Sequence, residues 1–178
     1  MNIVKKNITV KVPVKSNLER HPVPVLGIDY KVKIEYRNIK IAELDVENKT
    51  IKISLPNKYK KTSNTKILDL AIEKMYEQIA KVEIERAMEK VRIELGFAPE
   101  DYEIKNIGKK LGFCEDNKIT VNPEVVMFHR DFIDYVVLHQ YCHLKYKTHA
   151  KSFFKLLEKH EPNYKKFDTM IKELNYIN

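Results

Sequence analysis

Long apolar runs and cysteines are both scarce in this chain. No stretch approaches the roughly 18 consecutive apolar residues that a membrane-spanning helix needs, so we expect no membrane span. Residues 1–6 (MNIVKK) have no long apolar segment behind them, which indicates that there is no signal peptide. Two cysteines, Cys114 and Cys142, are too few for a disulfide framework. We therefore expect a cytoplasmic protein with reduced thiols.

Arginine is scarce as well, although the chain is basic. The net charge is +8, and only five of the 33 basic residues are Arg. The lysines are scattered, and no basic run is interleaved with aromatic residues. The charge permits a DNA partner, but the pattern favours a soluble, Lys-rich surface over a nucleic-acid site.

The apolar pattern predicts an α+β fold, with a small N-terminal antiparallel sheet followed by a mainly helical core. Residues 3–15 and 29–36 alternate apolar with polar side chains, which is typical of strands. Residues 39–44 and 51–55 flank a polar turn and predict a β-hairpin. These strands define a β-rich lobe, residues 1–60, in which no phosphate-binding loop or ligand cluster is apparent.

The second part, residues 61–178, is predicted to be the catalytic core. A long helical pattern begins near Lys66 and is closed by Gly96 and Pro99. A strand at 118–122 precedes an apolar helix that carries the only pattern in the chain with clear chemistry. That pattern is H-Q-x-x-H-x-x-x-x-x-H, from His139 to His149.

The three histidines of this pattern predict a zinc site. His139 and His143 are four residues apart, so on a helix both imidazoles point from the same face. His149 follows six residues later, and a chain that turns back after the helix presents a third imidazole. Three nitrogen ligands with one open position are typical of a catalytic zinc site. The alternative is that His139 and His143 are only polar residues on a helix surface, but the apolar residues before them argue against an exposed face.

Gln140 stands where the H-E-x-x-H motif has its Glu. That Glu is the general base that deprotonates the attacking water in metalloproteases. Gln has nearly the same shape and can hydrogen-bond water, but it cannot accept a proton. The pattern is therefore a metalloprotease site whose base is replaced by a near-isostere, and we expect turnover to be impaired.

Two segments resemble the YgjP-like metallopeptidase family, which belongs with the WLM and SprT-like zincins. The first is IDYVVLHQYCHLKYKTHAKSFFKLLEKHEPNY, beginning at Ile133. It is similar to the family pattern through Tyr135, Val136, Val137, His139, Cys142, His143, Leu144, His149 and Phe153. The second, LGFCEDNKITVNPEVV, is similar through Gly112, Cys114, Ile119 and Asn122. The resemblance covers about residues 27–168, and the chain departs from it at Leu111, Phe113, Gln140 and Ala150.

The resemblance implies a zincin that hydrolyses peptide bonds in a protein substrate. In similar zincins the strand before the active-site helix lies along the cleft, and its free edge pairs with an extended substrate. This implies a substrate-binding edge strand formed by Ile119, Thr120, Val121 and Asn122, with an internal strand as the alternative. Tyr164 is a candidate to stabilise the oxyanion, with simple packing on the helix as its alternative.

Several functions stay open at this point. Gln140 is either a deliberate Glu→Gln change that makes an inactive mutant, or the mark of a natural pseudo-protease. Because all three histidines are retained, we favour the deliberate change. A peptide-binding module with structural zinc is a further alternative. The relatives also include proteases that act on DNA-bound proteins and others connected with ubiquitin-like modifiers, so such a modifier or its conjugate is a candidate partner.

Overall fold

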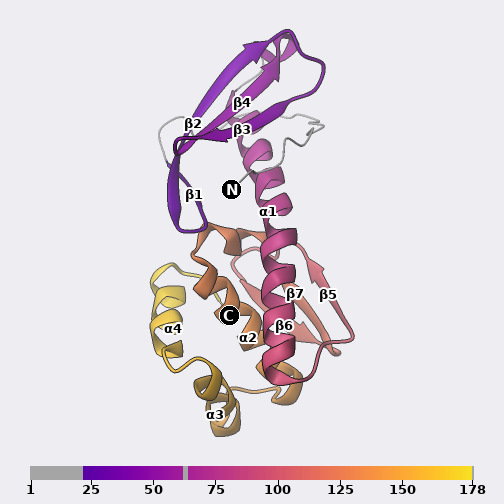
Figure 1. Ribbon diagram of the computed structural model, residues 1–178, viewed down its shortest axis with the longest axis vertical. Coiled ribbons are helices and arrows are strands. Elements are labelled where there is room, and N and C mark those ends of the chain that lie inside the picture. The colour runs from indigo at the N-terminus through magenta and orange to yellow at the C-terminus, as the bar shows by residue number, and fades with distance from the viewer. Residues whose placement is uncertain (1–21, 62–63, 178) are drawn as a thin grey trace. The chain divides into compact units, whose positions relative to one another are not determined.

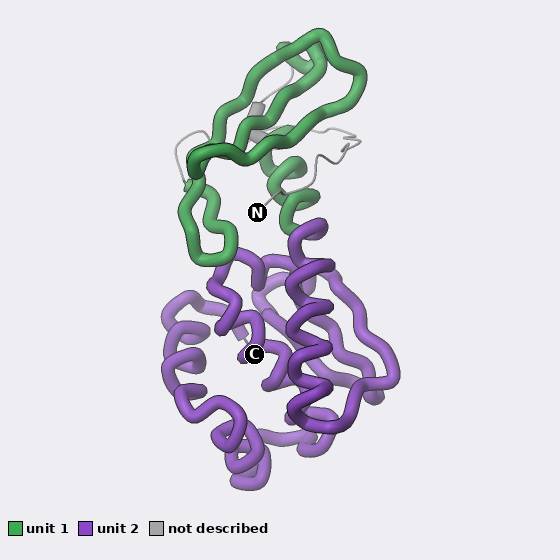
Figure 2. The backbone as a smooth tube through the Cα atoms, in the orientation of Figure 1, with its two compact units in different colours: residues 1–76 green, residues 77–178 purple. Residues whose placement is uncertain are grey.

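The computed structural model describes residues 22–61 and 64–177, in two compact units (Figure 2). Unit 1 comprises residues 1–76 and unit 2 residues 77–178. The boundary falls inside helix α1 (Asn64–Leu95), whereas the sequence suggested a boundary at residue 60. The strand predicted over 3–15 lies outside the described residues.

Unit 1 is built on a four-stranded sheet of order β1-β2-β4-β3 (Figure 1). Its strands are β1 (Val23–Val25), β2 (Ile28–Arg37), β3 (Glu43–Glu47) and β4 (Thr50–Pro56), followed by the short 3₁₀ helix η1 (Asn57–Tyr59). β1 pairs with β2 and β3 pairs with β4 in antiparallel fashion, but β2 and β4 are parallel. The sheet is therefore mixed rather than purely antiparallel.

The predicted hairpin is confirmed, and its sequence explains the order of the strands. Asn48 and Lys49 both have positive φ, at 47° and 58°, as the tight turn between β3 and β4 requires. β4 is the apolar strand, with Ile51, Ile53 and Leu55 fully buried, so it takes the interior position. β3 carries alternate acidic residues and lies at the edge, where charge opposes further strand pairing. In this arrangement β4 pairs with β2 in parallel.

Unit 2 contains a three-stranded sheet and, after α1, one 3₁₀ helix and three α-helices. The strands are β5 (Asp101–Ile104), β6 (Gly112–Glu115) and β7 (Lys118–Val121), and the helices are η2 (Pro123–Met127), α2 (Arg130–Lys145), α3 (Lys151–His160) and α4 (Tyr164–Glu173). Figure 1 shows α2 with α4 on one side and β6 and β7 on the other, and α2 contacts all three. The expected α+β class is confirmed. No helix among residues 22–61 and 64–177 has the length and apolar character needed to cross a membrane.

The prediction that residues 119–122 form an edge strand is wrong. β7 is the middle strand, parallel to β5 on one side and antiparallel to β6 on the other. A tight turn at Asp116 and Asn117, both with positive φ, folds β6 back onto β7. Ile119, Thr120 and Val121 are consequently buried, and both edges of β7 are used.

Asn122 has a structural role that its position after β7 explains. Its side chain is fully buried, and its Nδ2 donates to the carbonyl oxygens of Gly108 and Lys110 at 3.0 and 2.9 Å. Its Oδ1 accepts a hydrogen bond from the backbone N–H of Glu124 and so caps η2. Asn122 therefore stabilises the loop before β6 and does not face a substrate.

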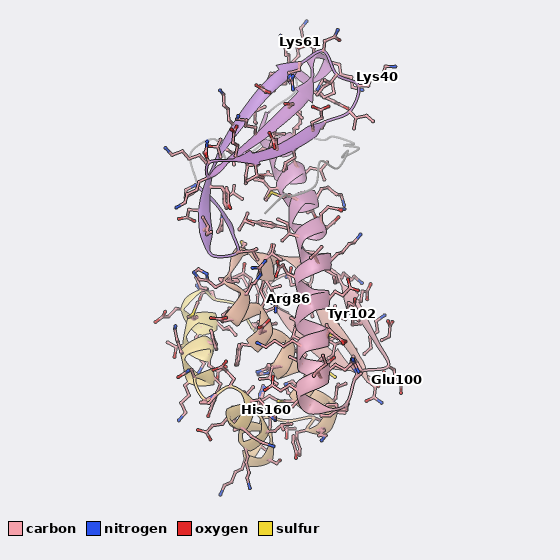
Figure 3. The ribbon with its side chains drawn as sticks, in the orientation of Figure 1. Lys40, Lys61, Arg86, Glu100, Tyr102 and His160 are labelled. Atoms are coloured by element: carbon pink, nitrogen blue, oxygen red, sulfur yellow. The ribbon has the colours of Figure 1, made fainter. Side chains whose placement is uncertain are left out.

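A buried carboxylate, Glu83, connects α1 to the start of α2 within unit 2. Its two oxygens accept hydrogen bonds from the Arg130 guanidinium at 2.8 and 2.6 Å. Arg86, labelled on α1 in Figure 3, donates to Glu83 at 3.1 Å and to Asp134 at 2.6 Å. The hydrogen bond from Arg130 is the main reason that the pKa of Glu83 lies below its usual range, against the opposing effect of burial.

Replacing Glu83 with Gln is expected to lower the free energy of unfolding by about 1–3 kcal/mol at pH 7, because both guanidinium groups lose an ionised partner. A lowered pKa stabilises the fold above the unfolded-state value and is lost as the pH falls through the folded-state value. The difference in the free energy of unfolding between the protein with Glu83 and the Glu83→Gln variant should therefore be constant from about pH 6 to 8 and should shrink below about pH 4. Denaturant titrations at several pH values measure it.

The matched control for this experiment is Glu85→Gln, because Glu85 is exposed on the same helix. This variant should unfold like the wild type at every pH. A pH-independent difference between wild type and Glu83→Gln would contradict the proposed ionic role of Glu83.

Candidate metal centre

The fold brings the three predicted histidines together around one point. His139 and His143 lie one turn apart on α2, and His149 lies in the loop between α2 and α3. The Nε2 atom of His149 is 2.9 Å from Nε2 of His139 and 3.1 Å from Nε2 of His143. The helix ends at Lys145, and the extended Tyr146 begins the turn that returns His149 to the other two. The three nitrogens thus converge as the sequence predicts.

Phe153 supports all three imidazoles from behind. Its ring centroid lies 4.9 Å from that of His139, 4.6 Å from that of His143 and 4.7 Å from that of His149. Phe153 is fully buried on α3, so it forms an apolar wall on the inner side of the cluster. Helix α3 therefore packs behind the site and holds His149 in position.

The second ring nitrogens of His139 and His143 have hydrogen-bonding partners that orient them. Nδ1 of His143 lies 3.0 Å from the carbonyl oxygen of Tyr146, which can only accept, so His143 carries its proton on Nδ1. Nδ1 of His139 lies 3.3 Å from the hydroxyl of Tyr135, which in turn donates to Asp168. Both arrangements leave Nε2 free of a proton and directed at the centre of the cluster.

Burial favours the neutral form of the two helical imidazoles, His139 and His143. The pKa of His139 is lowered to about 3, chiefly by burial and then by the nearby His143 and His149. Burial is also the main cause that lowers the pKa of His143. Neutral imidazoles near pH 7 present lone pairs, which is the form that binds a metal.

The geometry fits a zinc ion. Zn–N bonds of about 2.0–2.1 Å in a tetrahedral arrangement separate the ligand nitrogens by about 3.3–3.4 Å. The two Nε2–Nε2 separations in the structure, 2.9 and 3.1 Å, are close to this value. In the described part of the chain the cluster contains these three histidines and no carboxylate or thiolate. His139 is buried while His149 is exposed, so a fourth position would be open towards solvent.

Two residues near the motif have other roles. Cys142 lies between His139 and His143 in the sequence, but it is fully buried, and burial raises the pKa of its thiol to about 12. Cys142 is therefore a core residue rather than a ligand. Tyr164 is mostly buried, and its ring stacks on Phe154 with centroids 5.7 Å apart. This packing corresponds to the alternative reading of Tyr164, and its role at an oxyanion stays a prediction.

Gln140 lies against the backbone of β6. Its side chain is 1% exposed, and a Cβ atom placed on Gly112 would stand 3.0 Å from its Cγ and 3.1 Å from its Nε2. Gly112 therefore leaves room for the residue at position 140, next to the histidine cluster. This close approach explains why a strand position is occupied by glycine.

Replacing Gly112 with Ala is expected to lower the free energy of unfolding by about 1–3 kcal/mol, because the new methyl group would stand 3.0–3.2 Å from three atoms of the buried Gln140 side chain, which would have to shift. The strain should disappear in the Gln140→Ala background, where that side chain is absent. Chemical denaturation of the four proteins in this cycle measures the coupling. An equal cost of Gly112→Ala in both backgrounds would show that the contact with Gln140 is not the cause.

The sequence did not reveal that Tyr135 and Asp168 lie next to the histidine cluster. Tyr135 was identified only through its match to the family pattern, yet its position four residues before His139 on the same helix is a usable signal. Asp168 lies 33 residues beyond Tyr135 on a different helix, α4. No spacing rule connects these two residues, so only the fold reveals the contact.

A buried helix with two histidines one turn apart, completed by a third histidine from the next loop, defines a metal centre of the metallopeptidase type. The model of the YgjP-like metallopeptidase domain matches residues 3–174, and the chain belongs to this family. The resemblance inferred from the motifs is therefore confirmed.

Two solved structures are similar to part of the chain. One is the metallopeptidase zymogen abylysin from Pyrococcus abyssi, 24% identical, with a TM-score of 0.46, covering 52% of this chain and 96% of its own. The other is the metallopeptidase zymogen jannalysin from Methanocaldococcus jannaschii, 21% identical, with a TM-score of 0.46, covering 51% of this chain and 88% of its own. Among curated proteins, none matches the chain.

Proposed function

We propose that this chain binds zinc through His139, His143 and His149, binds an extended peptide beside it, and hydrolyses that peptide only slowly. The observation that carries the proposal is the convergence of three Nε2 atoms beside a buried Gln140. The convergent nitrogens support metal binding, and the family supports peptide hydrolysis as the chemistry. Gln140 supports the slow rate, because the general base is missing.

The side chains divide the chemistry among them. The three imidazoles would hold the ion, which supplies Lewis acidity towards a peptide carbonyl. Gln140 can donate a hydrogen bond through its amide and accept one through its oxygen, so it can orient a water molecule. It cannot take the proton of that water or return it to the leaving amine. The same missing group thus affects both proton transfers.

We place the substrate on β6, since β7 has no free edge. The carbonyl oxygen of Leu111 accepts a hydrogen bond from the N–H of Asn122 at 2.9 Å. In an antiparallel pair, successive residues direct their backbone groups alternately towards and away from the partner strand, so this bond sets the direction for the residues that follow. The peptide groups of Gly112 and Cys114 therefore face away from β7, at the outer edge of the sheet. An extended peptide can add to this edge by backbone hydrogen bonds, next to Gln140.

The experiment that tests the proposal compares cleavage of denatured proteins by the chain with Gln140 and by Gln140→Glu. Cleavage by the variant, followed by mass spectrometry of the products, supports a peptidase. Cys114→Pro in the same background removes one outward N–H donor and should weaken binding at β6. Retained peptide binding without any gain in cleavage would favour a binding module with structural zinc.

The origin of Gln140, the partners and the compartment are also part of the proposal. Gln140 is either a deliberate replacement of Glu or the natural residue of a pseudo-protease, and comparison with the native gene distinguishes these two explanations. A protein or peptide is the proposed partner, and a ubiquitin-like modifier or its conjugate is one candidate. DNA as a partner is supported only by the net charge of +8. Cys114 and Cys142 are both free thiols, which favours a reducing compartment such as the cytoplasm.

A further inference from the structure

Helix α4 contributes one polar side chain, Asp168, to the outer surroundings of the histidine cluster. The hydroxyl of Tyr135 donates a hydrogen bond to Oδ1 of Asp168. The same hydroxyl oxygen lies 3.3 Å from Nδ1 of His139. A carboxylate on α4 is thus connected, through one hydroxyl group, to the most deeply buried of the three imidazoles.

The ring of Tyr135 is fixed by aromatic packing. Tyr135 is 1% exposed and stacks on Phe167 with centroids 4.9 Å apart and an interplanar angle of 22°. The rings of Phe132 and Phe167 pack in a T-shaped arrangement, with centroids 5.9 Å apart. Because Phe167 directly precedes Asp168 on α4, the same contact that fixes the Tyr135 ring also places the carboxylate at its hydroxyl.

The direction of the hydrogen bonds follows from the charge of Asp168. A carboxylate accepts a hydrogen bond more strongly than a neutral imidazole nitrogen, so the single hydroxyl proton of Tyr135 points to Asp168. The hydroxyl oxygen is then an acceptor, and the proton of His139 belongs on Nδ1. If the hydroxyl proton pointed to Nδ1 instead, the proton of the neutral imidazole would lie on Nε2 and block the metal-binding position.

We propose that Asp168 and Tyr135 are positioning residues that set the tautomer and the donor strength of His139 for metal binding. The inference rests on the proposed zinc site and assigns a function to α4. The three histidines are not equivalent in this respect. His143 is oriented by a backbone carbonyl, that of Tyr146, whereas His139 depends on two side chains that substitution can remove.

Loss of an outer partner of a metal-binding His typically weakens the metal by about 10–100-fold. Tyr135→Phe keeps the stacked ring and removes only the hydroxyl, so we expect an effect within this range. Asp168→Asn keeps the shape and still accepts a hydrogen bond but removes the charge, so we expect an effect near the lower end. Once the hydroxyl is absent, Asp168→Asn should cause no further loss.

The test is a double-mutant cycle read out as zinc affinity. The dissociation constant of zinc is measured by competition with a chromophoric chelator for the wild type, Tyr135→Phe, Asp168→Asn and the double variant. Tyr141→Phe is the matched control, because Tyr141 is equally buried on α2 and its hydroxyl donates to the carbonyl of Met88, away from the cluster. The absorption spectrum of the cobalt-loaded proteins reports the ligand arrangement independently.

The expected result is weaker zinc binding in both single variants, a double variant no weaker than Tyr135→Phe, and an unchanged affinity in Tyr141→Phe. Unfolding of the zinc-free proteins separates this from a merely structural tie between α2 and α4. Unchanged zinc affinity in Tyr135→Phe and Asp168→Asn, with lower stability of the zinc-free fold, would overturn the inference. Absence of zinc binding by the wild type would instead overturn the proposed metal site itself.

Discussion

Replacing Gln140 with Glu is expected to raise peptidase activity by about 10²–10⁴-fold or more, the contribution of one general base. The estimate lies towards the upper end because the same carboxylate would serve both proton transfers. Glu and Gln differ little in shape, and Gly112 already provides the space that this side chain occupies. Burial at this position would raise the pKa of a Glu, which suits a base that works near neutral pH.

The measurement is the rate of cleavage of a denatured protein mixture at saturating zinc. Gln140→Ala is the matched control, because it changes the same side chain without adding a base, and it should stay as slow as the chain with Gln140. His149→Ala combined with Gln140→Glu should lose the gained activity. A zinc-loaded, folded Gln140→Glu variant that cleaves nothing would contradict the peptidase assignment and favour a binding module.

The second large effect is expected from His149→Ala. Removing one of three directly bound imidazoles should weaken zinc by more than the roughly 100-fold upper limit for an outer partner. His149 is exposed and lies in a loop, so its loss should leave the core of unit 2 intact. The dissociation constant for zinc, measured by chelator competition, gives the size of the effect.

His129→Ala is the control for this variant. His129 is exposed at the N-cap of α2, ten residues before His139, and its side chain makes no capping hydrogen bond. Its removal should leave zinc affinity unchanged. Equal zinc affinity of His149→Ala and the wild type would show that the third imidazole is not a ligand.

The pair on α2 could be predicted because helical spacing alone brings residues four apart onto one face. His149 was less constrained, because its approach depends on the chain turning at Tyr146 and on Phe153 packing behind all three rings. The motif spacing predicted that His149 approaches the other two imidazoles, and the structure places it there. Sequence spacing was therefore sufficient to predict contacts between residues within one helix.

The errors and omissions concern contacts between distant segments. An apolar alternating segment such as 118–121 fits a half-buried edge and a central strand equally well, so its place between β5 and β6 had to come from the fold. The parallel pairing of β2 with β4 has the same origin, since strand order is not a local property. The contact of Asp168 with Tyr135 could not be predicted either, because only the packing of α4 on α2 brings the two residues together.

Zinc content per chain is the most direct test of the metal centre on which these inferences rest. The protein with Gln140, purified without chelator and loaded with zinc, is dialysed against chelator-free buffer and analysed for metal by elemental analysis. The three-histidine site predicts one zinc ion per folded chain. A folded chain that retains no zinc under these conditions would contradict the account and leave the histidine cluster without its proposed function.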